Sequence, residues 1–214
     1  MARNIRKGSE KAMATEMKYS TAIKGASFLY LELKKLAKLK VNNSDISIKE
    51  LRKKAVEENI FQVDTVNRRK TIARAIIKRI KVLDDYLIDR LIDGTIETSK
   101  QIAMYSILKT DRLFFEFMNE VYLEKYLLKD PILEDKDFNI FFQNKAEQSE
   151  RVAGWTDYTY YKLKQVLIRI LFEAGFIKNQ KSREIVRPII NKELADYLEN
   201  IGDKKYLGAM LYTY

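Results

Sequence analysis

Apolar residues recur at helical spacing along most of the chain. Between residues 22 and 39, the apolar positions Phe28, Leu31, Leu36 and Leu39 alternate with lysines, as on one face of an amphipathic helix. The same spacing predicts helices over residues 48–58, 65–85, 86–93, 99–108, 111–127, 138–146, 158–174 and 192–201. The segment 86–93 is either a helix of its own or a continuation of the preceding one. With only 7 glycines and 2 prolines in 214 residues, the chain is predicted to be mainly α.

Local signals mark where several of these helices begin and end. Ser47 is followed three residues later by Glu50, which is the pattern of a capping box. Asp64 or Thr65 is placed to cap the next helix, and Gly175 to end the helix over 158–174. The helices 48–58 and 65–81, joined by a short link, therefore form a helix–turn–helix-like pair.

The pattern changes after Gly175. Phe176 and Ile177 predict a short strand, residues 178–182 a polar turn, and residues 183–190 a second strand that ends near Pro188. A helix followed by such a hairpin is typical of a winged helix, whose hairpin is the wing. We therefore predict a helix–turn–helix-like N-terminal unit and a C-terminal winged-helix unit with a small β-hairpin wing.

Composition divides the chain further. We expect a flexible basic tail in residues 1–18, the helix–turn–helix-like unit in 19–93, an acidic helical middle in 94–150 and the winged-helix-like unit in 151–214. Residues 1–81 carry 21 lysines and arginines against 8 acidic residues, residues 82–160 carry 9 against 16, and residues 161–214 carry 10 against 6. Charge segregated in this way favours a polyanionic partner for the basic parts, whereas the alternative is a merely solvated basic surface.

Two helices carry cations in a stripe suited to DNA. On a 3.6-residue wheel, one polar stripe of the helix 65–85 lies within about 80°, opposite its isoleucines. Lysine and arginine neutralise phosphates, and arginine or glutamine also contacts base edges. The predicted DNA-binding residues are Asn67, Lys70, Arg74, Lys78 and Lys81 on the first helix, Tyr158, Lys162, Gln165 and Arg169 on the helix 158–174, and Lys178, Lys181 and Arg183 on the wing.

Catalysis has little support in this sequence. The absence of histidine and cysteine excludes serine and cysteine triads, thiolate zinc sites and histidine switches. Asp85, Asp89 and Asp93 are spaced to share Mg²⁺, and residues 134–136 match half of a nuclease motif, but a solvated helix face and a charged linker explain both. There is no glycine-rich phosphate loop. We expect no catalytic residue, metal, cofactor or small-molecule substrate.

No membrane association is expected. The longest stretch without a formal charge is residues 206–214, whereas a membrane-spanning helix needs about 20 apolar residues. The basic N-terminus is not followed by an apolar run, so a secretory signal is not predicted. The expected location is the cytoplasm.

A set of short segments over roughly residues 19–190 is shared with one known family. The set comprises Tyr19-Ser20, Gly25-Ala26-Ser27-Phe28-Leu29, Glu32, Glu57-Glu58-Asn59-Ile60-Phe61-Gln62, Arg68, Ile72-Ala73, Arg79, Gly154-Trp155-Thr156-Asp157, Thr159, Lys162-Leu163 and Leu171-Phe172-Glu173-Ala174-Gly175. In this order they resemble the BrxA family of bacterial BREX phage-defence systems. The resemblance implies a small, helical, non-enzymatic protein that binds double-stranded DNA and is encoded beside a methyltransferase and other defence proteins.

Together these observations predict a double-stranded DNA-binding component of a BREX system, with other BREX proteins as further partners. The alternative is an adaptor or assembly protein whose winged helix contacts protein. RNA binding and a carboxylate-dependent nuclease are more distant alternatives.

Overall fold

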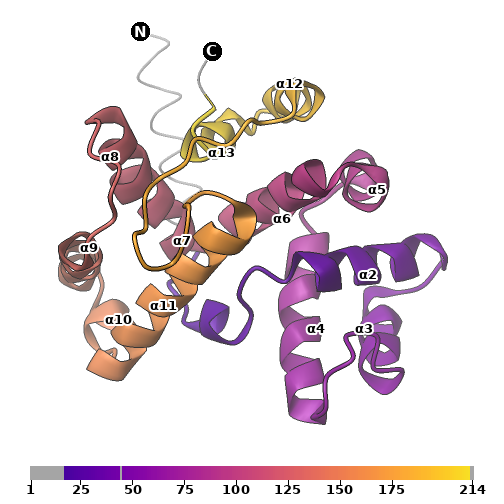
Figure 1. The fold of residues 1–214 in the computed structure, drawn as a ribbon. Helices are drawn as coiled ribbons and strands as arrows, with labels where there is room; N and C mark the ends of the chain where they lie inside the picture. The colour runs from indigo at the N-terminus through magenta and orange to yellow at the C-terminus, as the bar shows by residue number, and fades with distance from the viewer. Residues whose placement is uncertain (1–16, 44, 213–214) are drawn as a thin grey trace, which may run out of the picture.

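The computed structural model describes residues 17–43 and 45–212, and most of the tail predicted for 1–18 lies outside them. The described chain is mainly helical, as predicted (Figure 1). Its elements are the 3₁₀ turn η1 (Ala22–Gly25), α2 (Tyr30–Val41), α3 (Ile48–Glu57), α4 (Val66–Ile80), α5 (Asp85–Asp93), α6 (Ile96–Thr110), α7 (Arg112–Phe117), the π-helical turn η2 (Met118–Tyr122), α8 (Leu123–Leu127), α9 (Asp135–Gln148), α10 (Glu150–Ala153), α11 (Asp157–Ala174), α12 (Lys192–Asn200) and α13 (Lys204–Ala209).

The predicted capping signals are confirmed. Ser47 Oγ accepts a hydrogen bond from Glu50 N at 3.2 Å, and Glu50 Oε2 accepts one from Ser47 N at 3.0 Å, which completes the capping box of α3. Thr65 caps α4 through Arg68 N. Gly175 ends α11 with a φ of 85°, a left-handed conformation that glycine adopts without a steric cost.

Helix α6 forms the centre of the molecule. Every residue from Gln101 to Leu108 is buried, which is typical of a helix surrounded by protein. Helices α2, α4, α5, α7, α11 and α13 all contact it. Helices α2, α3 and α4 gather on one side of the molecule and α8, α9 and α10 on the other, with α6 and α11 between them (Figure 1). Buried side chains from Tyr19 to Leu211 belong to one hydrophobic core.

The predicted β-hairpin wing is wrong. The described residues contain no strand, and Ile177 and Ile185 form only an isolated bridge. Two backbone hydrogen bonds of 2.9 Å flank that bridge, from Val186 N to the carbonyl of Phe176 and from Lys178 N to that of Glu184, while Ile185 N lies on the other edge and donates to the carbonyl of Pro131 at 2.6 Å. The pairing does not extend into a ladder, because Phe176 N donates to the carbonyl of Leu171 in α11 and Pro188 has no amide hydrogen. The winged-helix assignment is not supported, although the chain does reverse direction between α11 and α12.

The helix predicted over residues 22–39 is interrupted at Ala26–Leu29. The guanidinium of Arg79 donates to the carbonyls of Phe28, Ala26 and Ser27 at 2.6, 2.8 and 2.7 Å, so these oxygens are unavailable to a helix. Leu29 adopts a left-handed φ of 51°. As a result the buried face of α2 consists of Leu33, Leu36 and Ala37. Leu31, which was predicted to lie on the apolar face, is exposed.

Other boundaries also differ from the sequence pattern. Asp84 caps α5, so 85–93 is a separate helix rather than a continuation of α4. A short helix, α10, follows α9 in a segment where the spacing of apolar residues predicts no helix. Helix α13 was not predicted, because its six residues are too few to display a helical period.

Candidate nucleic-acid interface

The outer face of α4 carries the predicted basic stripe. Asn67, Lys70, Arg74 and Lys81 are exposed, while the isoleucines of the same helix are buried, as the wheel predicts. Within residues 17–43 and 45–212, no acidic side chain forms an ion pair with any of the three cations. Lys78 differs from them, because its ammonium group donates a hydrogen bond to the carbonyl of Thr110 at the end of α6. The stripe therefore presents three cations that no acidic side chain neutralises.

Helix α3 adds basic residues that the sequence reasoning missed. An open groove of about 290 Å³ between α3 and α4 is lined by Lys49, Arg52, Lys53, Val56 and Glu57 of α3 and by Lys70 of α4. The signal was present in the sequence, because positions 49, 52, 53 and 56 follow the i, i+3, i+4, i+7 spacing of one helix face. The groove itself exists only because α3 packs against α4.

The predicted stripe on α11 is partly engaged with its own neighbours. Tyr158 is 65% exposed, and Gln165 and Arg169 are exposed. Lys162 is half-buried, with its ammonium nitrogen 5.4 Å from the ring centroid of Tyr158 and 5.6 Å from that of Tyr161. Gln165 Nε2 donates to Tyr161 Oη at 2.7 Å. This face is therefore as much aromatic as basic.

Two of the three predicted DNA-binding cations on the loop after α11 are paired with acids. Lys178 lies 2.5 Å from Glu184, and Arg183 binds Asp135 at the start of α9. The hydrogen bonds from Arg183 and from Lys164 hold the pKa of Asp135 below its usual range. Lys181 is exposed and has no acidic partner among the described residues. Hence all three predicted residues lie on one loop, and Lys181 alone of the three has no ion pair with an acid of the described chain.

The turn η1 lies between the two predicted surfaces. It contacts both α4 and α11. Lys24 Nζ donates to Thr159 Oγ1 of α11 at 3.3 Å, and Arg68 of α4 donates to the carbonyl of Gly25. Helices α4 and α11, which carry the two stripes, are therefore linked through η1, which lies between them (Figure 1).

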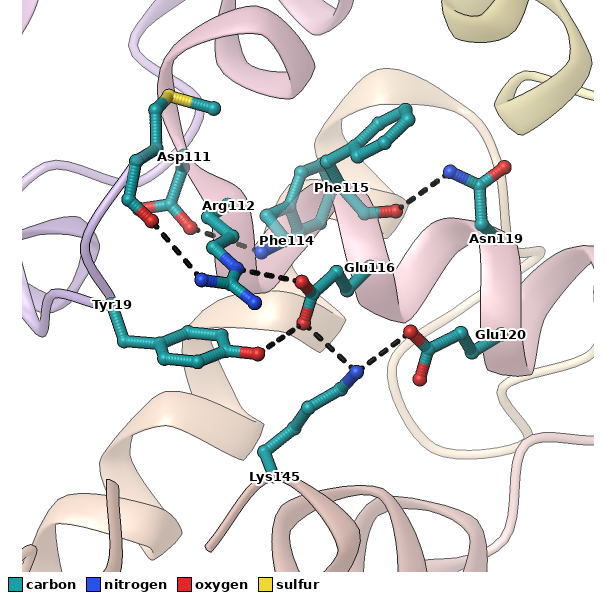
Figure 2. A network of polar contacts seen from close by, with 10 residues as sticks. Tyr19, Asp111, Arg112, Phe114, Phe115, Glu116, Asn119, Glu120 and Lys145 are labelled. Atoms are coloured by element: carbon teal, nitrogen blue, oxygen red, sulfur yellow. Dashed lines mark hydrogen bonds and ion pairs between the residues drawn. The ribbon is translucent and has the colours of Figure 1, made fainter. Parts of the chain in front are cut away.

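A buried ionic network lies apart from these surfaces, where α7, η2 and α9 meet the segment before η1 (Figure 2). Glu116 accepts hydrogen bonds from Tyr19 Oη at 2.7 Å, Arg112 Nε at 2.7 Å and Lys145 Nζ at 2.9 Å. Lys145 also lies 2.6 Å from Glu120. Each of these charged side chains has an oppositely charged side chain within hydrogen-bonding distance. The ion pairs therefore join α7, η2 and α9 to one another.

The electrostatics of Glu116 reflect this network. Burial alone would raise the pKa of this carboxyl, but the hydrogen bonds from Arg112, Lys145 and Tyr19 outweigh burial and hold the pKa below its usual range. Burial and the bond to the carboxylate raise the pKa of the Tyr19 phenol. The sequence reasoning missed this cluster, and its one local signal is the i, i+4, i+8 spacing of Arg112, Glu116 and Glu120.

Comparison with known proteins identifies the family. The sequence profile of BrxA matches residues 17–202, a range that includes α3, α4, α11 and the loop after it. The chain belongs to the BrxA family. A relative from Bacillus cereus (strain H3081.97), named BREX protein BrxA, is 52% identical over 200 residues that cover 93% of this chain and 99% of the relative. Membership therefore makes this chain a component of a BREX phage-defence system.

More distant BrxA relatives share less sequence. BREX protein BrxA of Paramagnetospirillum magneticum (strain ATCC 700264 / AMB-1) is 22% identical over 69% of this chain and 74% of its own length. A crystal structure of an uncharacterized protein from Magnetospirillum magneticum superposes with a TM-score of 0.79 at 22% identity, over 91% of this chain and 98% of that one. That likeness shows that the two chains share a fold.

The described part of this BrxA-family chain offers no cluster of acidic residues for a metal ion. Among the described residues, no three or more acidic side chains gather where they could hold a metal ion. Asp135 and Lys136, from the predicted half-motif, lie at the start of a helix and form ion pairs with Arg183 and Glu134 respectively. No helix in the described part is both long and apolar enough to cross a membrane.

Proposed function

We propose that this chain is the non-enzymatic, double-stranded DNA-binding component of its BREX system. The observation that carries the proposal is the outer face of α4, where Lys70, Arg74 and Lys81 are exposed and no acid of the described chain neutralises them. Cations presented in this way attract phosphates, because each contact releases a condensed counterion from the DNA. Family membership supports the BREX assignment, and the basic face supports the ligand.

The arrangement of α3 and α4 suits a duplex. The two helices pack against each other, and α4 presents its long polar face outward. In helix–turn–helix proteins the second helix lies in the major groove while the first crosses the backbone. With Asn67 and Arg74 exposed, α4 also carries side chains of the types that contact base edges.

A second candidate function is protein contact through α11. Tyr158 and Tyr161 are exposed, and two of the three predicted DNA-binding cations on the loop after α11 are already paired within the chain. Exposed tyrosines are typical of protein interfaces. In this alternative the chain assembles other BREX proteins, and α4 contributes only loose DNA binding.

Binding to a labelled random-sequence duplex, between about 50 and 200 mM salt, tests the proposal. We expect a steep loss of affinity with salt, and a further loss in the double variant Lys70→Glu/Arg74→Glu. Lys192→Glu is the matched control, because Lys192 is exposed on α12 and lies on another part of the molecule. No binding by the unmodified protein at about 50 mM salt would refute DNA binding and favour the adaptor function.

The adaptor function predicts the complementary result. Tyr158→Ala/Tyr161→Ala would then abolish co-purification with other BREX proteins, while the duplex affinity stays unchanged. Competition between duplex DNA and duplex RNA of equal length separates DNA binding from RNA binding.

A further inference from the structure

We propose that the groove between α3 and α4 seats one phosphodiester of the DNA backbone, held from the α3 side by Lys49 and Arg52 and from the α4 side by Lys70. The proposal rests on the proposed function and deepens it, because it adds α3 to the interface. It also states that residues of both helices bind the same phosphate, instead of each cation binding a phosphate of its own.

The charges around the groove are unbalanced. Four cations and a single acid line it. The acid, Glu57, lies 4.0 Å from Lys53, and both side chains of that pair are largely exposed. No acidic side chain of the described chain forms an ion pair with Lys49, Arg52 or Lys70. Like charges gathered on facing helices repel one another, and an anion between them relieves that repulsion.

The dimensions and chemistry of the groove suit a phosphodiester. The groove is open to solvent and has a volume of about 290 Å³, so a tetrahedral phosphate with its flanking sugar oxygens has room. Arginine presents a planar fork of donors that binds two oxygens at once, and lysine supplies a compact charge. Arg52 on one wall and Lys70 on the other are thus matched to a diester with two free oxygens.

The position of Lys70 connects the groove to the DNA. Lys70 lines the groove, and Arg74 and Lys81 follow it along the outer face of α4. A strand anchored in the groove would therefore run beside α4, where the remaining cations meet the next phosphates. A free phosphate would bind the same groove by the same chemistry but would use neither Arg74 nor Lys81.

A double-variant comparison tests whether Arg52 and Lys70 share one phosphate. We expect Arg52→Gln and Lys70→Gln each to lower the duplex affinity about tenfold, as for one charge-assisted hydrogen bond. The affinity loss of the double variant should be clearly smaller than the product of the two single-variant losses, since the second change acts on a phosphate already released. Arg52→Gln combined with Arg74→Gln is the matched control. Its affinity loss should equal the product of the two single-variant losses.

The salt dependence gives a second measurement. Arg52→Gln/Lys70→Gln should reduce the slope of log affinity against log salt by about 0.9, the value for one phosphate, rather than by about twice that. Lys192→Gln should leave affinity and slope unchanged. Unaltered circular-dichroism melting of each variant shows that folding is intact, since exposed side chains are being replaced.

The outcomes separate this proposal from the proposed function. If Arg52→Gln binds like the unmodified protein while Arg74→Gln binds more weakly, the groove is not part of the interface and DNA binding stands. If the two changes in Arg52 and Lys70 are fully multiplicative, the shared phosphate is refuted. If inorganic phosphate raises the melting temperature in an Arg52-dependent way but no duplex binds, the groove is a free-anion site, and both the proposed function and the backbone assignment fail.

Discussion

Removing the carboxylate of Glu116 should strongly destabilise the fold. Its side chain is 13% exposed and accepts hydrogen bonds from three groups that come from separate parts of the chain. Glu116→Ala would leave Lys145, whose side chain is 3% exposed, with Glu120 as its remaining carboxylate. Arg112 would keep the ring of Tyr19, 4.1 Å away, and a long contact with the carbonyl of Met17.

The magnitude follows from these remaining partners. Removing one member of a buried ion pair costs about 3–5 kcal/mol, because the other charge stays buried without compensation. Since Lys145 and Arg112 each keep a second contact, we expect the lower end, about 3 kcal/mol. For a chain of this length that corresponds to a fall in melting temperature of about 6–12 °C. Tyr19→Phe, which removes only one hydrogen bond, should cost about 1 kcal/mol.

Urea unfolding followed by circular dichroism measures both effects, with the slope of the transition showing whether unfolding stays two-state. Asp89→Ala is the matched control, because Asp89 is an exposed acid on α5 and its loss should change stability by less than about 0.5 kcal/mol. The reasoning is refuted if Glu116→Ala costs no more than Asp89→Ala.

Three further predictions concern other parts of the chain. Arg79→Met should cost about 3 kcal/mol or more in urea unfolding, since three carbonyls lose their donor and two of these hydrogen bonds are buried; a loss below about 1 kcal/mol would contradict this. The folded-state pKa of Glu116 lies below its unfolded value of about 4.3, so its contribution is present above about pH 4.3 and is lost as the pH falls through the folded pKa. A Glu116→Gln variant should therefore show a flatter fall in melting temperature between about pH 5 and 3, and an unchanged profile would oppose it. In duplex-binding assays, Lys181→Gln should weaken affinity more than Lys178→Gln, because Lys178 already has an acidic partner; equal losses would argue against that difference.

The charge of Arg79 is central to the Arg79→Met experiment. Burial lowers the pKa of its guanidinium to about 10, while Asp111 and Glu32 act in the opposite direction. The group therefore remains protonated at neutral pH and keeps all its donors. Because it binds the carbonyls of Ala26 to Phe28, it fixes the turn that leads from η1 into α2.

Much of the secondary structure could be predicted from the sequence, because it depends on neighbours a few residues away. The Ser47–Glu50 capping box and the Gly175 terminator are local hydrogen-bonding and backbone preferences. The two faces of α4 follow from helical geometry alone, so the buried isoleucines and the exposed Lys70 and Arg74 were predictable.

Contacts between distant residues decided the rest. After Gly175 the pairing stays at one bridge between Ile177 and Ile185, and the other edge of Ile185 is bonded to the loop around Pro131, a contact that no periodicity in residues 176–190 records. The same limit applies to the candidate interface. Whether a lysine is available to DNA depends on the acids that the fold brings beside it, as Glu184 beside Lys178 illustrates.

Sequence by itself thus determined most of the helices, several of their ends, the family and the excess of positive charge in the first third of the chain. Only the tertiary structure decided which of those charges are neutralised and that Arg52 and Lys70 face one groove. The physical reason is range. Helical periodicity and capping act over about four residues, whereas ion pairs and grooves join side chains that the chain separates widely and packing brings together.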